Sequence, residues 1–428
     1  MYGLRGGVSG SRWHPGNAAG SGHPGALRGG GEAGRIVSLD DTLLDDPAAL
    51  VEVDTGRMLA STASSGAAIR VALSADADEI LAPLIAQGRP RSLVVVGAGG
   101  SSAPGEVLAA VAGRGSPVPV FALGGPTLPG WIGPMDLVVA VSASGHSAET
   151  LTFVTEAQRR GSAVLGIGAV DSPLQDLCST ARGVSFWPVS RLSPLRDVQK
   201  ARSLLWALSA PLVLLAGEMG LVQHARHGLA GAATRLDERA VDCGVERPLV
   251  DNPAKELSIH LTGGLPLVWG SGDVGAVAAR RLGRQLAENA DWPSVVGVLP
   301  EAVRTHAGLL RGPWAHPVDE TDIFRDRTEE EGPQPRLRTL LVRDPSEHPD
   351  TTAIAEAVIQ TCDRMDVPCV AVMGNGGHAI EALADLIGLL DFASVYAALM
   401  QRRDPSRSAE DIDPRFGRHQ SGGTSWNV

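Results

Sequence analysis

Ser142, Ser144 and Ser147 lie in a short loop between an apolar run, 135–141, and the start of a helical pattern. The run has the largely apolar composition of a strand that is buried on both faces. Where such a strand ends and a helix begins, free backbone N–H groups and the helix dipole favour an anion, and small hydroxyls can complete its hydrogen bonds. The loop therefore predicts a phosphate site. A serine-rich turn that only caps the helix explains this one loop equally well.

A second loop of similar character lies about forty residues earlier. The apolar run 91–96 is followed by loop 97–102, with the sequence Gly-Ala-Gly-Gly-Ser-Ser, and then by a helical pattern. Glycines let the backbone approach a ligand closely. The loop lacks the third glycine of GxGxxG, and no Gly-Lys-Ser/Thr follows as in a P-loop. Two such loops, one β–α–β unit apart, are expected to meet at one anionic ligand.

The two loops together resemble those of sugar isomerase (SIS) domains, which bind phosphosugars. The resemblance rests on a Gly-Gly-Ser segment at 99–101 and on the segment 142–150, Ser-Ala-Ser-Gly-His-Ser-Ala-Glu-Thr. It implies that five residues contact the phosphate of a sugar phosphate: Gly100, Ser101, Ser142, Ser144 and Ser147.

Composition narrows the class of protein. The chain has 428 residues, 43% of them hydrophobic, which suits two α/β domains plus extensions. Its formal net charge of −11 disfavours nucleic acid as the main partner. The four cysteines form no CxxC pair, which indicates reduced thiols and a cytoplasmic location. We find no metal motif, expect no cofactor, and see neither an apolar run of membrane-spanning length nor a signal peptide.

Apolar runs alternate with helical patterns in both halves of the chain. This alternation predicts two three-layer αβα sandwiches with parallel, flavodoxin-like sheets. Pro119 places the run 118–122 at a sheet edge. The predicted segments are a disordered extension (1–34), an N-terminal helical segment (35–90), the first SIS domain (91–200), inter-domain helices (201–255), the second SIS domain (256–403) and a C-terminal tail (404–428).

Three further features narrow the resemblance. They are segment 288–293 (Glu-Asn-Ala-Asp-Trp-Pro) with a following Leu-Pro-Glu, segment 389–399 with a following Asp-Pro, and Arg202, nine residues before Pro211 in an apolar helical pattern. Together they resemble the bifunctional phosphoglucose/phosphomannose isomerase family of double-SIS proteins. The resemblance covers roughly residues 90–415.

The resemblance implies aldose–ketose isomerisation through an enediol(ate), and it assigns the base to Glu288. A partly buried carboxylate suits proton transfer between C1 and C2. From the residues alone, Glu288 could equally be a solvated surface group. The resemblance assigns to Arg202 the stabilisation of the developing oxyanion. Arg196 is the rival candidate.

Two positions depart from the family pattern. The family's ring-opening histidine would fall at Arg304, which is a poor acid–base group, whereas His306 lies two residues further on. The family's late lysine is also missing, and Arg415 or Arg418 stands in that region. We take His306 as the candidate third catalytic residue.

The leading hypothesis is a cytoplasmic isomerase that interconverts glucose 6-phosphate, mannose 6-phosphate or both with fructose 6-phosphate, without metal or cofactor. The alternative is a catalytically weak phosphosugar-binding sensor, because the family histidine and lysine are unmatched. Another SIS enzyme, such as an aminosugar-phosphate isomerase, comes third, and a nucleotide-binding Rossmann enzyme last. The expected partner is a sugar phosphate, with neither nucleic acid nor membrane, and the resemblance implies a homodimer.

Overall fold

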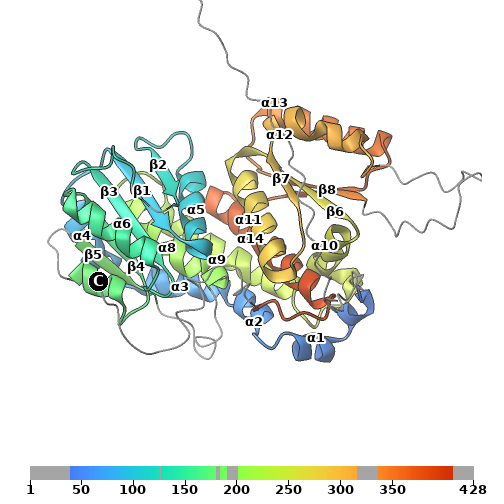
Figure 1. Ribbon diagram of the computed structural model, residues 1–428, viewed down its shortest axis with the longest axis horizontal. Coiled ribbons are helices and arrows are strands. Elements are labelled where there is room, and N and C mark those ends of the chain that lie inside the picture. The colour runs from blue at the N-terminus through green and yellow to red at the C-terminus, as the bar shows by residue number, and fades with distance from the viewer. Residues whose placement is uncertain (1–38, 126, 180–183, 190–200, 316–335, 408–428) are drawn as a thin grey trace, which may run out of the picture. The chain divides into compact units, whose positions relative to one another are not determined.

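The computed structural model describes residues 39–125, 127–179, 184–189, 201–315 and 336–407. Within these ranges the chain forms two parallel sheets flanked by helices (Figure 1). The predicted fold class, two parallel three-layer α/β sandwiches, is confirmed. The predicted disordered extension 1–34 lies outside the described residues.

The first sheet has five parallel strands in the order β2-β1-β3-β4-β5. The strands are β1 (Ser92–Gly97), β2 (Val120–Leu123), β3 (Asp136–Ser142), β4 (Ala163–Gly168) and β5 (Val184–Pro188). Every residue of β1 and β3 is buried, as expected for strands that are covered on both faces. β2 lies at the edge, which confirms the inference from Pro119.

The second sheet repeats this topology with four parallel strands in the order β7-β6-β8-β9. The strands are β6 (Leu265–Gly270), β7 (Val295–Val298), β8 (Leu337–Arg343) and β9 (Cys369–Met373). In both sheets the first strand lies between the second and the third. The strand order therefore reverses beside β1 and beside β6, and ligands of open α/β sheets bind at such a point.

Alternate residues of each strand face different helices. On β1, Leu93 and Val95 pack with the cluster that includes α5 (Ala103–Ala112) and α8 (Leu205–Glu218). Val94 and Val96 face α6 (Ala148–Arg159) and α7 (Pro173–Ser179). The second sheet packs in the same way between two groups of helices. One group is α10 (Pro253–Thr262), α11 (Gly272–Ala290) and α14 (Ala379–Leu399), and the other is α12 (Glu301–His306) and α13 (Pro349–Arg364).

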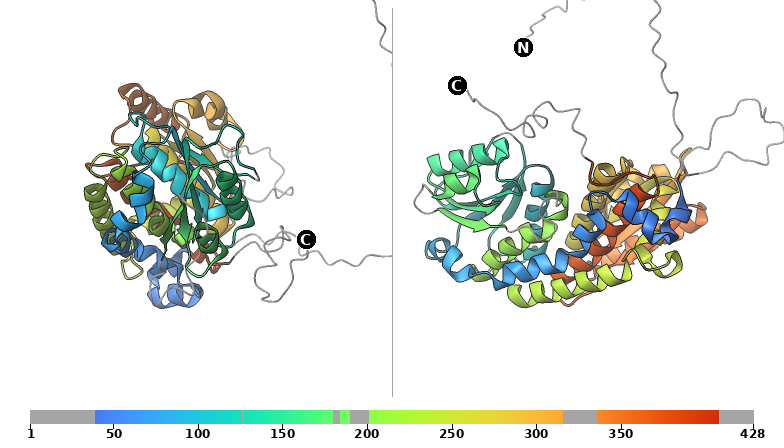
Figure 2. Two further views of the ribbon diagram at one scale, coloured as in Figure 1. Left: turned by 90° about the vertical axis from the view of Figure 1, so that its left-hand side faces the viewer. Right: turned by 90° about the horizontal axis from the view of Figure 1, so that it is seen from below.

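Helix α14 lies at the centre of the core. It packs against α11, α10 and α9 (Ala225–Asp242), and Figure 2 shows it alongside α9. It is the one helix in the described ranges that is long and apolar enough to cross a membrane, which corrects the prediction that no run reaches that length. Its apolar window is 100% buried inside the protein, so core packing accounts for its composition. The buried Tyr396 hydroxyl donates to the Cys243 carbonyl at 2.7 Å, as burial requires.

The remaining elements precede the first sheet or join the two sheets. Before β1 the chain forms short helices that pack in part against α8 and α9: η1 (Asp41–Asp45), α1 (Pro47–Val53), α2 (Met58–Ala63), α3 (Ser65–Ser74) and α4 (Ala77–Ile85). Short 3-10 segments carry site residues or link helices: η2 (Gly99–Ser102), η3 (Ala201–Ser203), η4 (Leu249–Asp251) and η5 (Ala307–Arg311). The domain bounds predicted from the sequence stay a prediction.

Asp136, at the start of β3, provides a test of stability that lies away from the serine loops. Its carboxylate accepts hydrogen bonds from Arg91 Nη2 at 2.6 Å, Ser92 Oγ at 2.7 Å and Gly133 N at 2.9 Å. Burial alone would raise the pKa of Asp136, but these donors outweigh burial and hold the pKa below its ordinary value. We expect Asp136→Asn to cost about 1.5–3 kcal/mol at pH 7.

The pH dependence of this cost follows from the sign of the shift. Because the folded pKa is depressed, the stabilisation is present above about pH 4 and is lost as the pH falls through the folded value. Urea unfolding of both proteins between pH 7 and pH 3 measures the difference. A gap that does not narrow on acidification would contradict the assignment.

Candidate phosphosugar site

The two serine-bearing loops meet at the carboxyl edge of the first sheet. β1 and β3 are hydrogen-bonded neighbours, with Gly97 paired to Val141 at their ends. Beyond the strands, the Ser101 hydroxyl accepts a hydrogen bond from the Ala143 backbone N–H at 3.2 Å. The loops are therefore in direct contact at the point where the strand order reverses, as a shared anion would require.

The serine side chains differ in burial. Ser101 and Ser142 are 5% and 2% exposed, whereas Ser144 is exposed and Ser147 is half-buried. The Ser142 hydroxyl accepts from Gly145 N at 3.1 Å, and Gly145 adopts a left-handed φ of 73° in the turn. Ser147 caps α6 by accepting from Thr150 N at 3.3 Å. The loop is thus preorganised, with the exposed Ser144 hydroxyl on its outer side.

Gly100 and Ser101 lie in η2, which leads directly into α5. The half-buried Gly100 carries no side chain, so its backbone can be approached closely. Two helices, α5 and α6, therefore begin beside the same loop pair, and the N-terminal dipoles of both favour an anion there.

Arg202 and Glu288 are brought together although 86 residues separate them. Arg202 Nη1 donates to the Glu288 carbonyl at 2.9 Å and lies 3.8 Å from the Glu288 carboxylate. The Arg202 side chain is 9% exposed and that of Glu288 is 40% exposed. η3, which carries Arg202, lies against η2 of the phosphate loop. Arg202 thus lies on an element that contacts the first serine loop, and Glu288 is linked to that loop through Arg202.

The surroundings of Arg202 differ from the prediction. Arg202 lies in the three-residue η3 before α8, and not within an apolar helix. Nη2 donates to the carbonyls of Pro405 at 2.8 Å and Arg407 at 3.1 Å. No atom in the described part of the chain accepts from the buried Nε. Burial lowers the pKa of Arg202, and the charge of Glu288 opposes this effect. The rival Arg196 lies outside the described residues, as do Arg415 and Arg418.

His306 is not brought to Arg202 and Glu288 within this chain. Its Nδ1 accepts from the Trp269 indole N–H at 3.2 Å, and a Cβ built on Gly297 would lie 2.9 Å from Nδ1. Neighbouring residues of a strand face opposite sides of a sheet, and Val296, next to Gly297, faces α11. His306 therefore lies on the face of the second sheet opposite to α11, the helix that carries Glu288.

The position that the resemblance assigns to the family histidine lies at the surface. Arg304 pairs with Glu301 at 3.0 Å, and their side chains are 72% and 66% exposed. A pair so open to solvent contributes little to stability. Its geometry gives Arg304 no contact with the candidate site.

The structure adds residues that the sequence did not single out. Arg281 donates to both oxygens of Asp391, at 2.8 and 2.7 Å, and its Nη2 also donates to the Arg202 carbonyl at 2.8 Å. Arg280 and Arg284 both pair with Glu106, in the first turn of α5. The only sequence signal was the spacing of Arg280, Arg284 and Glu288, four residues apart on one helix face.

A carboxylate contacts the loops of each sheet, and in the first sheet Glu149 accepts from the Ser147 hydroxyl at 3.1 Å. In the second sheet the carboxylate is Asp344. The Ser271 hydroxyl accepts from Asp344 N at 3.3 Å, as Ser101 does from Ala143 N. The Asp344 carboxylate then accepts from Val274 N at 3.0 Å, at the start of α11. An anion of the protein itself thus occupies this helix start. That the loops of the first sheet bind the phosphate stays a prediction.

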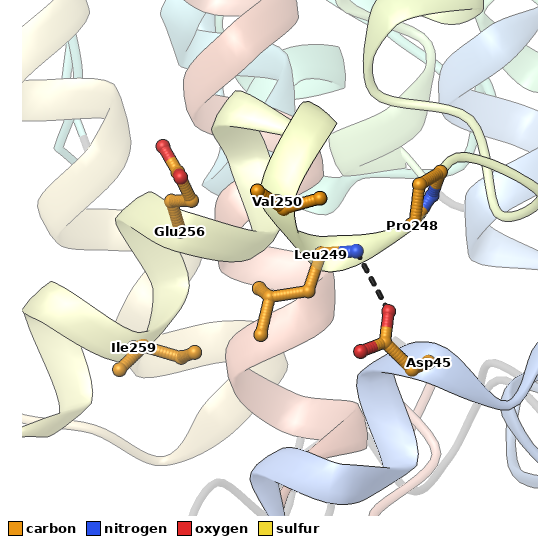
Figure 3. A pocket seen from close by; sticks show the side chains of 6 residues that line it. All are labelled: Asp45, Pro248, Leu249, Val250, Glu256 and Ile259. Atoms are coloured by element: carbon orange, nitrogen blue, oxygen red, sulfur yellow. Dashed lines mark hydrogen bonds between the residues drawn. The ribbon is translucent and has the colours of Figure 1, made fainter.

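The hollow drawn in Figure 3 contains none of the predicted site residues. It measures about 530 Å³ and is lined by Asp45, Pro248, Leu249, Val250, Glu256 and Ile259. The Asp45 carboxylate accepts from Leu249 N at 2.7 Å, and Glu256 adds a second carboxylate. Two acidic groups and an apolar lining disfavour a phosphate there.

Comparisons with known proteins point to one family. Residues 250–412 match the model of the bacterial phospho-glucose isomerase C-terminal SIS domain. A bifunctional phosphoglucose/phosphomannose isomerase of Caldicellulosiruptor bescii is 23% identical over 314 residues, which are 73% of this chain and 85% of that protein. The Aquifex aeolicus protein of the same name is 23% identical over 332 residues, which are 77% of this chain and 91% of that protein.

A solved structure shares the fold. The tagatose-6-phosphate ketose/aldose isomerase of Escherichia coli aligns with a TM-score of 0.58 at 16% identity, over 84% of this chain and 97% of that chain. At this identity the likeness concerns the fold alone. The match over 250–412 and the two curated relatives show that this chain is similar to the bifunctional phosphoglucose/phosphomannose isomerases, which agrees with the resemblance found in the sequence.

Proposed function

We propose that this protein is an aldose–ketose isomerase that interconverts glucose 6-phosphate, mannose 6-phosphate or both with fructose 6-phosphate. The observation that carries the proposal is the contact of η3 with η2, because it links Arg202, and through it Glu288, to the first serine loop, which itself contacts the second. In this proposal the phosphate-binding domain spans 91–200 and the second SIS domain spans 256–403. The protein acts in the cytoplasm as a homodimer, without metal or cofactor.

The chemistry follows from the placement of each group. The hydroxyls and backbone N–H groups of the serine loops bind the phosphate, which fixes one end of the open-chain sugar. The Glu288 carboxylate removes the proton from C2 of the aldose and returns it to C1, while a proton passes from the O2 hydroxyl to O1, with an enediol(ate) between the two steps. Arg202 stabilises the developing oxyanion, and its unpaired Nε is a donor that an acceptor could satisfy.

The position of His306 bears on the homodimer. Within one chain the second sheet separates His306 from the helix that carries Glu288. A ring-opening role for His306 therefore requires a second copy of the chain to supply it. Because Nδ1 of His306 accepts from the Trp269 indole N–H, the single N–H of the neutral imidazole lies at Nε2. Nε2 is therefore the proton donor.

The second candidate function is a phosphosugar-binding sensor with little or no turnover. Two observations favour it: Arg304 occupies the position of the family histidine, and Arg202 is already held by the carbonyls of Pro405 and Arg407. A sensor would need the serine loops but not the Glu288 carboxylate.

A coupled assay separates the two functions. The purified protein is incubated with glucose 6-phosphate or mannose 6-phosphate, and fructose 6-phosphate is measured enzymatically. Turnover of either hexose supports the isomerase. Thermal stabilisation by these sugar phosphates without any fructose 6-phosphate selects the sensor. If the protein shows neither turnover nor stabilisation, both functions are refuted.

Ser144 offers a test of the phosphate site with little risk to the fold. Its side chain is exposed, and its hydroxyl accepts only a 3.2 Å bond from His146 N among the described contacts. We expect Ser144→Ala to weaken sugar-phosphate binding roughly tenfold, because a hydrogen bond to a charged group is lost. Isothermal titration measures the change.

The matched control is Ser179→Ala, an exposed hydroxyl at the end of α7 that donates to Asp176 O at 2.9 Å. It should leave the affinity unchanged. Equal affinities for both variants and the unaltered protein would remove Ser144 from the proposed site.

A further inference from the structure

The phosphate loops follow strands of the first sheet, whereas Glu288 lies on a helix of the second. A contact between the two parts must therefore fix the distance between the bound phosphate and Glu288. The serine loops lie at the edge of the first sheet, whereas Glu288 is on α11, which packs on the second. An isomerase site that holds a phosphosugar by its phosphate must present C1 and C2 to the base at a fixed separation.

Each of the two helices involved is seated firmly on its own sheet. On α5, a Cβ added at Gly105 would lie only 2.9 Å from Ala122 Cβ and 3.0 Å from Val95 Cβ. On α11, a Cβ at Gly275 would lie 2.3 Å from the Val342 carbonyl, and one at Gly283 would lie 2.5 Å from Val296 Cγ2. Neither helix can move far without its sheet.

A single carboxylate joins these two helices. Glu106, next to Gly105, accepts from Arg280 Nε at 2.9 Å and also from Arg284 Nη2. Glu106 lies in the first turn of α5, directly after the phosphate loop. Arg284 is one turn before Glu288 on the same face of α11. The contact therefore lies between the two halves of the proposed site.

We infer that the Glu106–Arg280–Arg284 cluster is a positioning clamp, which sets the separation between the bound phosphate and the Glu288 carboxylate. The inference rests on the proposed isomerase function. Glu106 touches neither the substrate nor Glu288 in this account; it acts through α5 and α11. The side chains of Glu106, Arg280 and Arg284 are 21%, 41% and 37% exposed. Loss of the clamp should therefore disturb catalysis far more than stability, because partly exposed ion pairs stabilise little.

The test is Glu106→Gln in the full chain, with kcat, KM, the Kd for inorganic phosphate and Tm all measured. We expect kcat to fall roughly 10- to 100-fold, since a misplacement of about 1 Å can cost that much. The Kd for phosphate should stay within a factor of about two, because the serine loops are intact. Arg284→Gln removes one arm of the clamp and should show a smaller loss of kcat, and Arg284→Lys should restore part of it.

Asp237→Asn is the matched control, because it breaks another partly exposed pair between helices, Arg70 of α3 with Asp237 of α9. It should leave kcat unchanged. A Glu106→Gln protein with a lower Tm but unaltered kcat and KM would overturn the clamp and leave the isomerase proposal standing. Absence of turnover in the unaltered protein would overturn the isomerase proposal and the clamp with it.

Discussion

Glu288→Gln is expected to lower kcat for hexose-phosphate isomerisation by about 10²–10⁴-fold, with little change in KM. The substitution keeps the shape of the side chain but removes the group that we assign to proton transfer between C2 and C1. Arg202 donates at 2.9 Å to the backbone carbonyl of residue 288, a bond that the change does not touch. At 3.8 Å the carboxylate makes no hydrogen bond to Arg202. The guanidinium therefore keeps its bonds to the carbonyls of residues 288, 405 and 407 in the variant.

The measurement is a coupled assay of both hexose phosphates, with inorganic phosphate binding as a second measurement. Glu256→Gln is the matched control, because Glu256 lines the hollow of Figure 3 and not the serine loops. Its kcat should equal that of the unaltered protein. If Glu288→Gln retained turnover within a factor of about ten, Glu288 would not be the base. If Glu256→Gln lost turnover instead, the site would lie at that hollow.

Much of the fold could be predicted because parallel strands leave a simple signal in the sequence. Strands covered by helices on both faces are continuous apolar runs, and β1 and β3 are buried at every residue. Pro119 marked the edge position of the following β2, since proline cannot donate to a sheet ladder. The serine loops followed from the same rule, because neighbouring parallel strands end at the same edge.

The helices before the first sheet were harder to predict. The helical segment predicted over 35–90 consists of several short helices, and it is broken between α1 and α2, where Arg57 adopts a left-handed φ of 53°. Helix α3 begins with Ser-Gly, two residues with a weak preference for helix. Its packing against α8 and α9, a tertiary contact, outweighs its weak local preference.

The ionic contacts around the site could not be predicted from the sequence, for a different reason. Glu106 and its arginines are separated by 174 and 178 residues, and Arg281 and Asp391 by 110. Which residues form such pairs depends on how the helices pack on the sheets, and no local sequence pattern specifies this packing. His306 shows the same limit, because counting from Glu288 could not reveal that a sheet lies between the two residues.

Asp391→Asn is expected to destabilise the protein by about 3–5 kcal/mol, the largest effect on stability that we predict. Arg281 and Asp391 have side chains that are only 6% and 9% exposed, and two hydrogen bonds of 2.8 and 2.7 Å join them. The amide would leave the guanidinium buried without its counter-charge. Asp391 also lies on α14, whose residues are almost all buried, so water cannot readily replace the lost carboxylate.

The double variant Arg281→Met/Asp391→Leu distinguishes a lost ion pair from a lost side chain. Because it leaves no uncompensated charge, it should be markedly more stable than Asp391→Asn in urea unfolding. Asp237→Asn breaks a pair whose side chains are 50% and 47% exposed, and it should cost no more than about 1 kcal/mol. Arg281 also donates to the Arg202 carbonyl, so the double variant should lose activity even where its fold is stable. If the double variant were as unstable as Asp391→Asn, the loss of stability would come from altered packing and not from the uncompensated charge of Arg281.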